Sequence, residues 1–167
     1  MKTHNIFIVA SALALMFSSC QQSDMISDDA NKPMLFSIVT PGGHTRVADG
    51  AFEAEDKVGV YVTDYINDTT PAPLQISGNR ANNETMTFDG SAWAAERPIY
   101  WGEGKSDVYA YYPYMEIEDV DAQPFSVALD QTDDGAYEAS DLLWAKAEGV
   151  SQAKGAVSLA MQHQMSR

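Results

Sequence analysis

Alternation of apolar and polar residues near the end of the chain is the feature that most constrains its fold. Val157, Leu159, Met161, His163 and Met165 fall on one face of an extended chain, and small or polar residues stand between them. A helix over the same residues would place apolar side chains all around its circumference, so the pattern predicts a β-strand. His163 lies on the apolar face, where we expect a hydrogen-bonded core histidine rather than a ligand.

The same period of two recurs along most of the chain. It predicts strands at residues 34–39, 58–63, 85–88, 92–93, 108–114, 124–129 and 142–145, with the second of them half-buried. Turn-rich stretches separate these runs, and Asp89-Gly90 is a pair of the kind that closes a two-residue hairpin. Amphipathic helices of ten or more residues are not evident. Many short strands between turn signals predict an all-β sandwich.

The N-terminus has the pattern of an export signal. Lys2 precedes an apolar run over residues 6–17, and Ser18-Ser19-Cys20 follows it. This order is typical of a secretory signal peptide, and the run is shorter than the roughly 20 residues that span a bilayer. Residues 1–19 are similar to a bacterial lipoprotein signal, apart from Phe17 at a position that is usually aliphatic. Cys20 would then be the lipidated first residue of the mature protein. The alternative is an ordinary signal peptide with an incidental cysteine.

The remainder divides into a tether and one domain. Residues 20–33 are polar and acidic, which predicts a flexible tether, and an acidic stretch there also loosely resembles a surface-export signal of Bacteroidota lipoproteins. A plain solvated linker explains the same composition. Residues 34–167 have the length of one ordinary domain. Cys20 is the one cysteine of the sequence, so packing rather than disulfides must stabilise this domain.

The charge balance limits the partners. The sequence carries 24 Asp and Glu against 10 Lys and Arg, a formal net charge of −14. Such a surface repels phosphate groups, and no basic patch offsets it, so we expect no nucleic-acid partner. Solubility is a sufficient explanation of the acidity.

Residues that could carry catalysis or hold a cofactor are scarce. His44 lies in a glycine-rich turn, and no set of Cys, His and carboxylate ligands has zinc spacing. Asp130, Asp133, Asp134 and Gly135 resemble a calcium loop, but the ligand alternation is broken and the final Glu is missing. Neither a nucleophile motif nor a phosphate-binding glycine loop is present. We therefore expect a non-enzymatic protein without cofactor or metal, although a carboxylate pair of a glycosidase could form in space.

Aromatic residues offer a second kind of site. Their rings would stack on sugars if they were exposed together, whereas aromatics in a sandwich more often belong to the core. The residues concerned are Trp93, Tyr100, Trp101, Tyr109, Tyr111, Tyr112, Tyr114 and Trp144. A single exposed patch would favour a surface glycan-binding lipoprotein or adhesin.

Four short stretches, in order behind the lipoprotein signal, carry a resemblance to a known family. They are Thr45-Arg46-Val47 with Phe52 and residues 56–61; residues 107–114; Asp130-Gln131 with residues 140–145; and residues 157–159 with 163–166. Together they resemble the N-terminal domain of the fimbrillin family of Bacteroidota, the Mfa-like and major-fimbrium pilins. The resemblance covers about residues 36–167.

The resemblance implies a transthyretin-like Greek-key β-sandwich, the first of two such domains, in a structural subunit or accessory protein of a surface fimbria. It implies a lipoprotein at the outer membrane whose N-terminal segment is cut by an extracellular protease, often after an arginine. Arg46-Val47 is the matching processing site. The strand that would leave includes Leu35, Phe36, Ser37, Ile38 and Val39, and a strand of another subunit would take its place by β-strand addition.

The resemblance also implies a second domain after Arg167, which supplies the donor strand. The sequence ends where that domain would begin, directly after a predicted strand. We therefore expect it to be the N-terminal part of a longer protein. A truncated product, or a cap or anchor that needs no donor strand, are the alternatives.

Overall fold

The computed structural model of the chain describes residues 32–40, 52–130, 132, 135–136 and 138–164. Cys20, His44, Arg46 and Val47 lie outside these ranges. The signal peptide, the boundaries of the tether, the lipidation and the processing site therefore remain predictions. Within the described ranges, no helix is long and apolar enough to cross a membrane.

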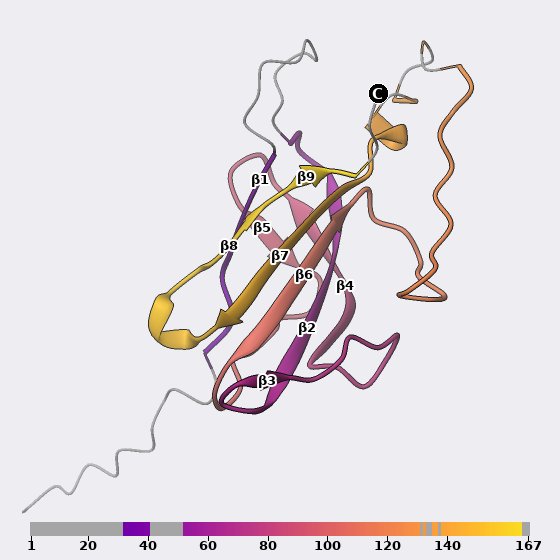
Figure 1. Ribbon diagram of the computed structural model, residues 1–167. Coiled ribbons are helices and arrows are strands. Elements are labelled where there is room, and N and C mark those ends of the chain that lie inside the picture. Colours follow the sequence, from indigo (N-terminus) through magenta and orange to yellow (C-terminus); the bar gives the residue numbers. More distant parts are fainter. Residues whose placement is uncertain (1–31, 41–51, 131, 133–134, 137, 165–167) are drawn as a thin grey trace, which may run out of the picture.

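A large antiparallel sheet forms the body of the domain (Figure 1). Its strands lie in the order β5 (Trp93–Ala95), β4 (Ala81–Phe88), β2 (Lys57–Asn67), β6 (Ser106–Tyr112), β7 (Leu143–Val150) and β9 (Gln162–His163). The short β3 (Thr70–Pro71) also pairs with β2. Short 3-10 turns, η2 (Glu138–Ser140) and η3 (Gln152–Lys154), flank β7. The all-β sandwich expected from the sequence is confirmed.

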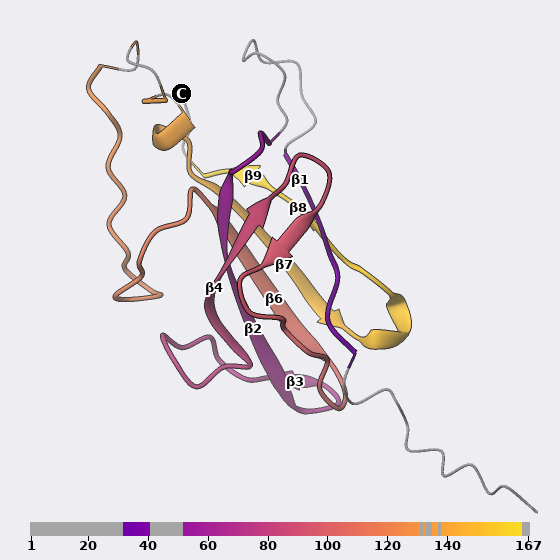
Figure 2. The same cartoon turned by 180° about the vertical axis from the view of Figure 1, so that it is seen from behind.

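The second layer consists of β1 (Phe36–Val39) and β8 (Val157–Ala160), which pair in parallel. Seen from behind, these two strands cross one face of the large sheet (Figure 2). The core lies between the layers. Fully buried aliphatic side chains supply it from both sides, among them Val58, Val60, Val62, Val108, Leu159 and Met161. We call this face of the large sheet the inner face.

The alternation at the end of the chain corresponds to two strands rather than one. β8 pairs with β1, whereas β9 pairs with β7 of the large sheet. Between them, the buried Met161 is the point at which the chain passes from one layer to the other. His163 is exposed after this passage, and its Nδ1 lies 2.7 Å from Oδ1 of Asp141. The prediction of a core histidine is therefore wrong, because the alternation does not continue on the same side of the sandwich.

The opposite, outer face of the large sheet is covered as well. All residues from Val58 to Thr63 are buried, so β2 is not the half-buried strand that its alternation predicts. The cover comes from residues 113–130, which follow β6 and make a long excursion beside the sheet (Figures 1 and 2). Residues 124–129 of this excursion form no strand, which contradicts the prediction. Phe125 instead turns toward the sheet, and Leu129 is fully exposed.

The predicted hairpin at Asp89-Gly90 exists between β4 and β5, with a longer turn than expected. Phe88 pairs with Trp93, so four residues lie between the paired positions. Oδ1 of Asp89 accepts hydrogen bonds from the backbone N–H groups of Ser91 and Ala92. Gly90 has a φ of 94°, a conformation that glycine adopts without strain. The side chain of Asp89 thus closes the turn in place of a two-residue loop.

Candidate functional site

The strand that we predict to be exchanged corresponds to β1, and its main chain joins it to β8. Ile38 lies opposite Leu159 in the parallel register. The backbone N–H of Val157 donates to the carbonyl of Leu35 at 2.8 Å, and that of Met161 donates to the carbonyl of Val39 at 2.9 Å. These bonds depend on the backbone alone. Any extended segment that lies parallel to β8 can make them.

Side chains of β1 and of the two residues before it alternate between the core and the surface. Met34 and Ile38 are each 5% exposed and belong to the core cluster, and Phe36 is half-buried against it. Leu35, Ser37 and Val39 are exposed, Leu35 to 63% and Val39 to 50%. The site therefore selects for apolar residues at every second position of the strand that occupies it.

Further contacts hold the start and the end of this segment. The backbone N–H of Met34 donates to the carbonyl of Ile99 at 2.7 Å, and that of Trp101 donates to the carbonyl of Lys32. Near the other end, Nε1 of Trp93 donates to the carbonyl of Ile38 at 3.2 Å. Like the pairing with β8, these three bonds use backbone atoms of the segment. A replacement strand of different sequence could therefore donate the first and accept the other two.

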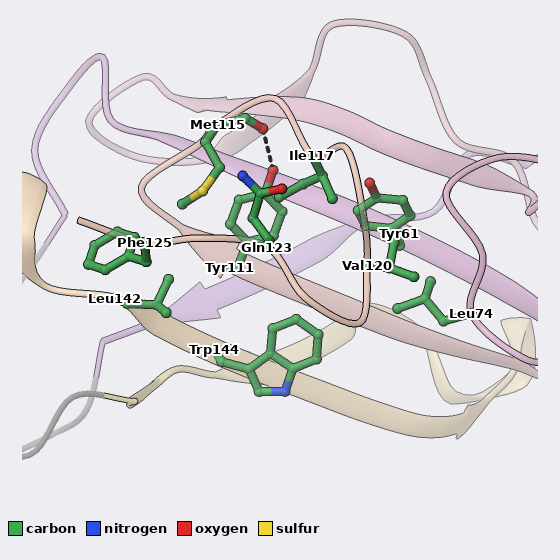
Figure 3. A pocket seen from close by; sticks show the side chains of 10 residues that line it. All are labelled: Tyr61, Leu74, Tyr111, Met115, Ile117, Val120, Gln123, Phe125, Leu142 and Trp144. Atoms are coloured by element: carbon green, nitrogen blue, oxygen red, sulfur yellow. Dashed lines mark hydrogen bonds between the residues drawn. The ribbon is translucent and has the colours of Figure 1, made fainter.

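An apolar pocket of about 120 Å³ lies on the outer face, between the sheet and its irregular cover (Figure 3). Tyr61, Tyr111, Leu142 and Trp144 line it from the sheet side, and Leu74 lines it from the segment before β4. The excursion adds Met115, Ile117, Val120, Gln123 and Phe125. The pocket is thus the incompletely filled centre of a second, smaller core that attaches residues 113–130 to the sheet.

Two tyrosines at this pocket differ in their hydrogen bonds. The hydroxyl of Tyr111 lies within hydrogen-bond distance of the side-chain oxygen of Asn83 and of the carbonyl of Met115. The hydroxyl of Tyr61 is buried and has no partner among the described residues. Burial raises the pKa of both phenols, so both stay protonated at neutral pH. The lining holds no carboxylate, histidine or thiol that could act as a base or nucleophile.

A buried carboxylate lies elsewhere on the outer face. Asp107 is 1% exposed, and its Oδ1 accepts a hydrogen bond from the backbone N–H of Gly149 at 2.8 Å. Its other oxygen lies 3.4 Å from Nζ of Lys146. The register between β6 and β7 shifts at this point, so Asp107 stabilises an irregularity of the ladder. We assign Asp107 a structural role. Its position at the start of a predicted strand did not distinguish it from an exposed carboxylate.

The aromatic residues do not form one exposed patch. Trp101 and Tyr111 are buried, and Phe52 makes edge contacts with Trp93 and Tyr112 at centroid distances of 4.8 and 5.5 Å. Tyr109 and Trp144 lie 5.9 Å apart on the outer face. Tyr100 is separate from these groups and is 42% exposed. The described part of the chain therefore has no extended platform of exposed aromatic rings.

Among the described residues, no group of three or more His, Cys, Asp and Glu residues could hold a metal ion. Oδ1 of Asp130 accepts hydrogen bonds from the hydroxyl and the backbone N–H of Thr132. These bonds lower the pKa of Asp130. Asp133 and Asp134 lie outside the described ranges.

Sequence reasoning missed a polar hollow at the start of β4. Glu84 is 5% exposed, and its carboxylate accepts the backbone N–H of Arg97 at 2.7 Å and Nη2 of the same residue at 2.8 Å. Arg80 forms a second bidentate pair with Asp64, at 2.7 and 2.6 Å. Glu84, Arg97 and Arg80 line a hollow of about 330 Å³, and Asp64 holds Arg80 from outside it. The two residues of each ion pair are 16 and 13 positions apart in sequence, so no local motif could indicate the hollow.

Comparison with known proteins decides the family. A model of the fimbrillin-like family matches residues 45–167, which is most of the chain. This chain belongs to the fimbrillin-like family. The resemblance stated from the sequence is thereby confirmed. A search of curated proteins found no match.

Two solved structures share the fold of this fimbrillin-like chain. A fimbrial protein from Bacteroides ovatus has a TM-score of 0.57 and 24% sequence identity over 81% of this chain. A candidate cell adhesion protein from Bacteroides uniformis has a TM-score of 0.52 and 22% identity over 79% of this chain. The matched regions span 29% and 47% of those two proteins, so this chain corresponds to less than half the length of either.

Proposed function

We propose that this fimbrillin-like chain is a structural subunit, or an accessory or anchor protein, of a bacterial surface fimbria. In this proposal it is exported as a lipoprotein on Cys20 and reaches the outer membrane. An extracellular protease cuts after Arg46, β1 leaves, and a strand of another subunit pairs with β8 in its place. The observation that carries the proposal is the attachment of residues 34–39, which combines backbone hydrogen bonds with the buried side chains of Met34 and Ile38.

The position of β1 supports exchange in three ways. It lies at the beginning of the domain, so one cut before residue 52 would separate it from the rest of the chain. Its pairing with β8 extends over four residue pairs, whereas β2 pairs with β6 over six. Its departure would uncover Val157, Leu159 and Met161, each at most 1% exposed, and such an apolar groove favours a new apolar strand.

The proposal also specifies the incoming strand. It would run parallel to β8 and place apolar side chains at the positions of Met34, Phe36 and Ile38. Residues at the positions of Leu35, Ser37 and Val39 face solvent and are free to vary. Because only alternate side chains of the bound strand are buried, a shift of its register by one residue would exchange the buried and the exposed side chains.

A peptide competition experiment tests this mechanism. The folded protein is treated with an arginine-specific protease, and a labelled peptide of residues 32–46 is added in excess. We expect the labelled peptide to replace the cleaved β1. A peptide with Ile38→Asp should fail to bind, and the matched peptide with Val39→Asp should bind, because Ile38 is buried and Val39 is half exposed.

Uncut protein and an Arg46→Ala variant serve as controls that should take up no peptide. Equal binding of the two substituted peptides, or no uptake after cleavage, would contradict strand exchange at β8. The lipoprotein part is tested separately, because Cys20→Ala should release the protein from membranes. Continued membrane association of that variant would contradict lipidation at Cys20.

A further inference from the structure

The polar hollow beside β4 has the size and the lining of a small-molecule site. At about 330 Å³ it falls at the lower end of the range of roughly 300–1,000 Å³ that is usual for ligand pockets. Arg80, Asn82, Glu84, Arg97 and Tyr100 line it, together with apolar groups at its base. Ion-paired side chains and one aromatic ring thus surround a single concave surface, in contrast to the apolar pocket of the outer face.

The charges of this hollow cancel locally. Arg97 pairs with Glu84 and Arg80 pairs with Asp64, so the formal charge of the four groups is zero on a chain of −14. Each pair is held by more than one hydrogen bond, which fixes the planar groups in place. The side chain of Arg97 is nevertheless 79% exposed, so its remaining N–H groups face solvent. A neutral ligand rich in hydroxyl groups matches such a surface, whereas an anion would approach against the charge of the whole chain.

Tyr100 supplies an apolar surface beside these polar groups. It is 42% exposed, and its neighbours Pro98 and Ile99 also line the hollow. Ile99 is buried, which anchors the segment that presents the ring. A tyrosine with one exposed face can stack against the C–H groups of a sugar ring while its hydroxyl remains in water.

A second hollow of about 160 Å³ continues the polar surface on another side of Arg80. Asp64, Gln75, Asn79 and Arg80 contribute polar groups to it. Thr63 also lines it, although this residue is 1% exposed. Its Oγ1 has no hydrogen-bond partner within the described part of the chain. A buried hydroxyl without a partner is costly, and a bound polar molecule is one way to satisfy it.

We propose that this fimbrillin-like domain binds a neutral saccharide in the hollow between β4 and Tyr100. A sugar ring stacks on Tyr100, and its hydroxyl groups pair with Arg97, Asn82 and the remaining lone pairs of Glu84. The hollow beyond Arg80 leaves room for a neighbouring sugar unit. The hollow contains no residue of β1 or β8, but it borders the segment before β1, because Tyr100 forms a bridge with Pro33 and the carbonyl of Ile99 accepts the N–H of Met34. We therefore expect the uncut chain to bind the saccharide.

Saturation-transfer difference NMR with a panel of methyl glycosides tests the proposal. The panel contains the glycosides of glucose, galactose, mannose and N-acetylglucosamine, each added to the full chain. We expect transfer to the ring protons of at least one glycoside. Tyr100→Ala should weaken its binding by about tenfold or more, which corresponds to roughly 1.4 kcal/mol. Arg97→Lys should weaken it as well, because lysine keeps the charge beside Glu84 and loses the planar fork.

Tyr109→Ala is the matched control, because it removes an aromatic ring from the outer face and leaves the hollow intact. It should bind the glycoside as the unaltered chain does. Absence of transfer with every glycoside of the panel would overturn the proposal. So would a loss of transfer in Tyr109→Ala with retention in Tyr100→Ala, since that result would place sugar binding on the outer face. Arg97→Lys keeps the test decisive if Tyr100→Ala does not fold.

Discussion

The two faces of the large sheet are covered in different ways. On the inner face, β1 and β8 form a regular strand pair whose aliphatic side chains alternate in and out. On the outer face, residues 113–130 form an irregular cover, held by aromatic packing and by the hydroxyl of Tyr111. A regular strand can be replaced by another extended segment, because its hydrogen bonds use the backbone. The irregular cover depends more on particular side chains, among them Tyr111 and Phe125, although the backbone N–H of Tyr114 also donates to the carbonyl of Lys57.

The largest effect is expected from the centre of the inner cover. Leu159 is 0% exposed and packs in the core between the layers. Leu159→Ala should lower the free energy of unfolding by about 2–5 kcal/mol, through lost burial and a residual cavity. Urea denaturation followed by circular dichroism measures this. A loss below about 1 kcal/mol would mean that β8 does not form the floor of the groove as described.

A smaller loss should follow when the outer cover is displaced. The ring of Tyr111 lies so close over Gly59 that a Cβ at that position would overlap it. Gly59→Ala should therefore push Tyr111 outward and cost roughly 1–3 kcal/mol. Cleavage after Glu116 and Glu118 by a glutamate-specific protease should become faster. Unchanged cleavage with unchanged stability would show that the ring moves without loosening the cover.

A still smaller effect is expected from the hydroxyl of Tyr111 alone. Tyr111→Phe keeps the ring over Gly59 but removes the hydrogen bond to the carbonyl of Met115. We expect a loss of about 1 kcal/mol in the free energy of unfolding, with the same faster cleavage after Glu116. Leu129→Ser is the matched control, because that side chain is fully exposed and should change neither quantity.

The smallest effect lies outside both covers, at the turn between β4 and β5. The backbone N–H of Ala92, then the hydroxyl and the N–H of Ser91, lower the pKa of Asp89. A carboxyl whose pKa is lowered on folding stabilises the protein above its unfolded value of about 3.9, and this contribution disappears as the pH falls through the folded value. The stability difference between the protein and Asp89→Ala should therefore shrink from pH 7 to pH 2. A difference that grows toward low pH would contradict the turn geometry.

Alternation in the sequence predicted the strands of both layers, because period two is a local property of the backbone. It could not show what covers each face. Tyr61 shares a pocket with residues of the 113–130 excursion, which helps to bury it. The alternation at residues 124–129 predicted a strand there, but these residues form an irregular cover instead. The run after residue 156 illustrates the same limit, since its alternation continues while the chain passes from one layer to the other at Met161.

The two candidate sites differ in the same respect. A strand at residues 35–39 could be predicted from alternation, and the family resemblance predicted its exchange, which stays a proposal. The hollow beside β4 joins Arg80, Glu84 and Arg97 from separate segments, and charged residues spread through an acidic chain give no local signal. Tyr100 is one of the aromatic residues that the sequence suggests for sugar stacking. Its exposure, next to the buried Trp101, could not be predicted from the sequence.

Amide hydrogen exchange, measured by NMR before and after cleavage at Arg46, tests the central claim most directly. The N–H groups of Val157 and Met161 bond to β1, whereas the ladder between β2 and β6 does not involve it. After cleavage and removal of β1, we expect exchange to accelerate at Val157 and Met161 while Val60 and Val108 stay protected. Adding the peptide of residues 32–46 should restore the protection. Loss of protection throughout the domain, or none at β8, would contradict the account of β1 as a replaceable strand.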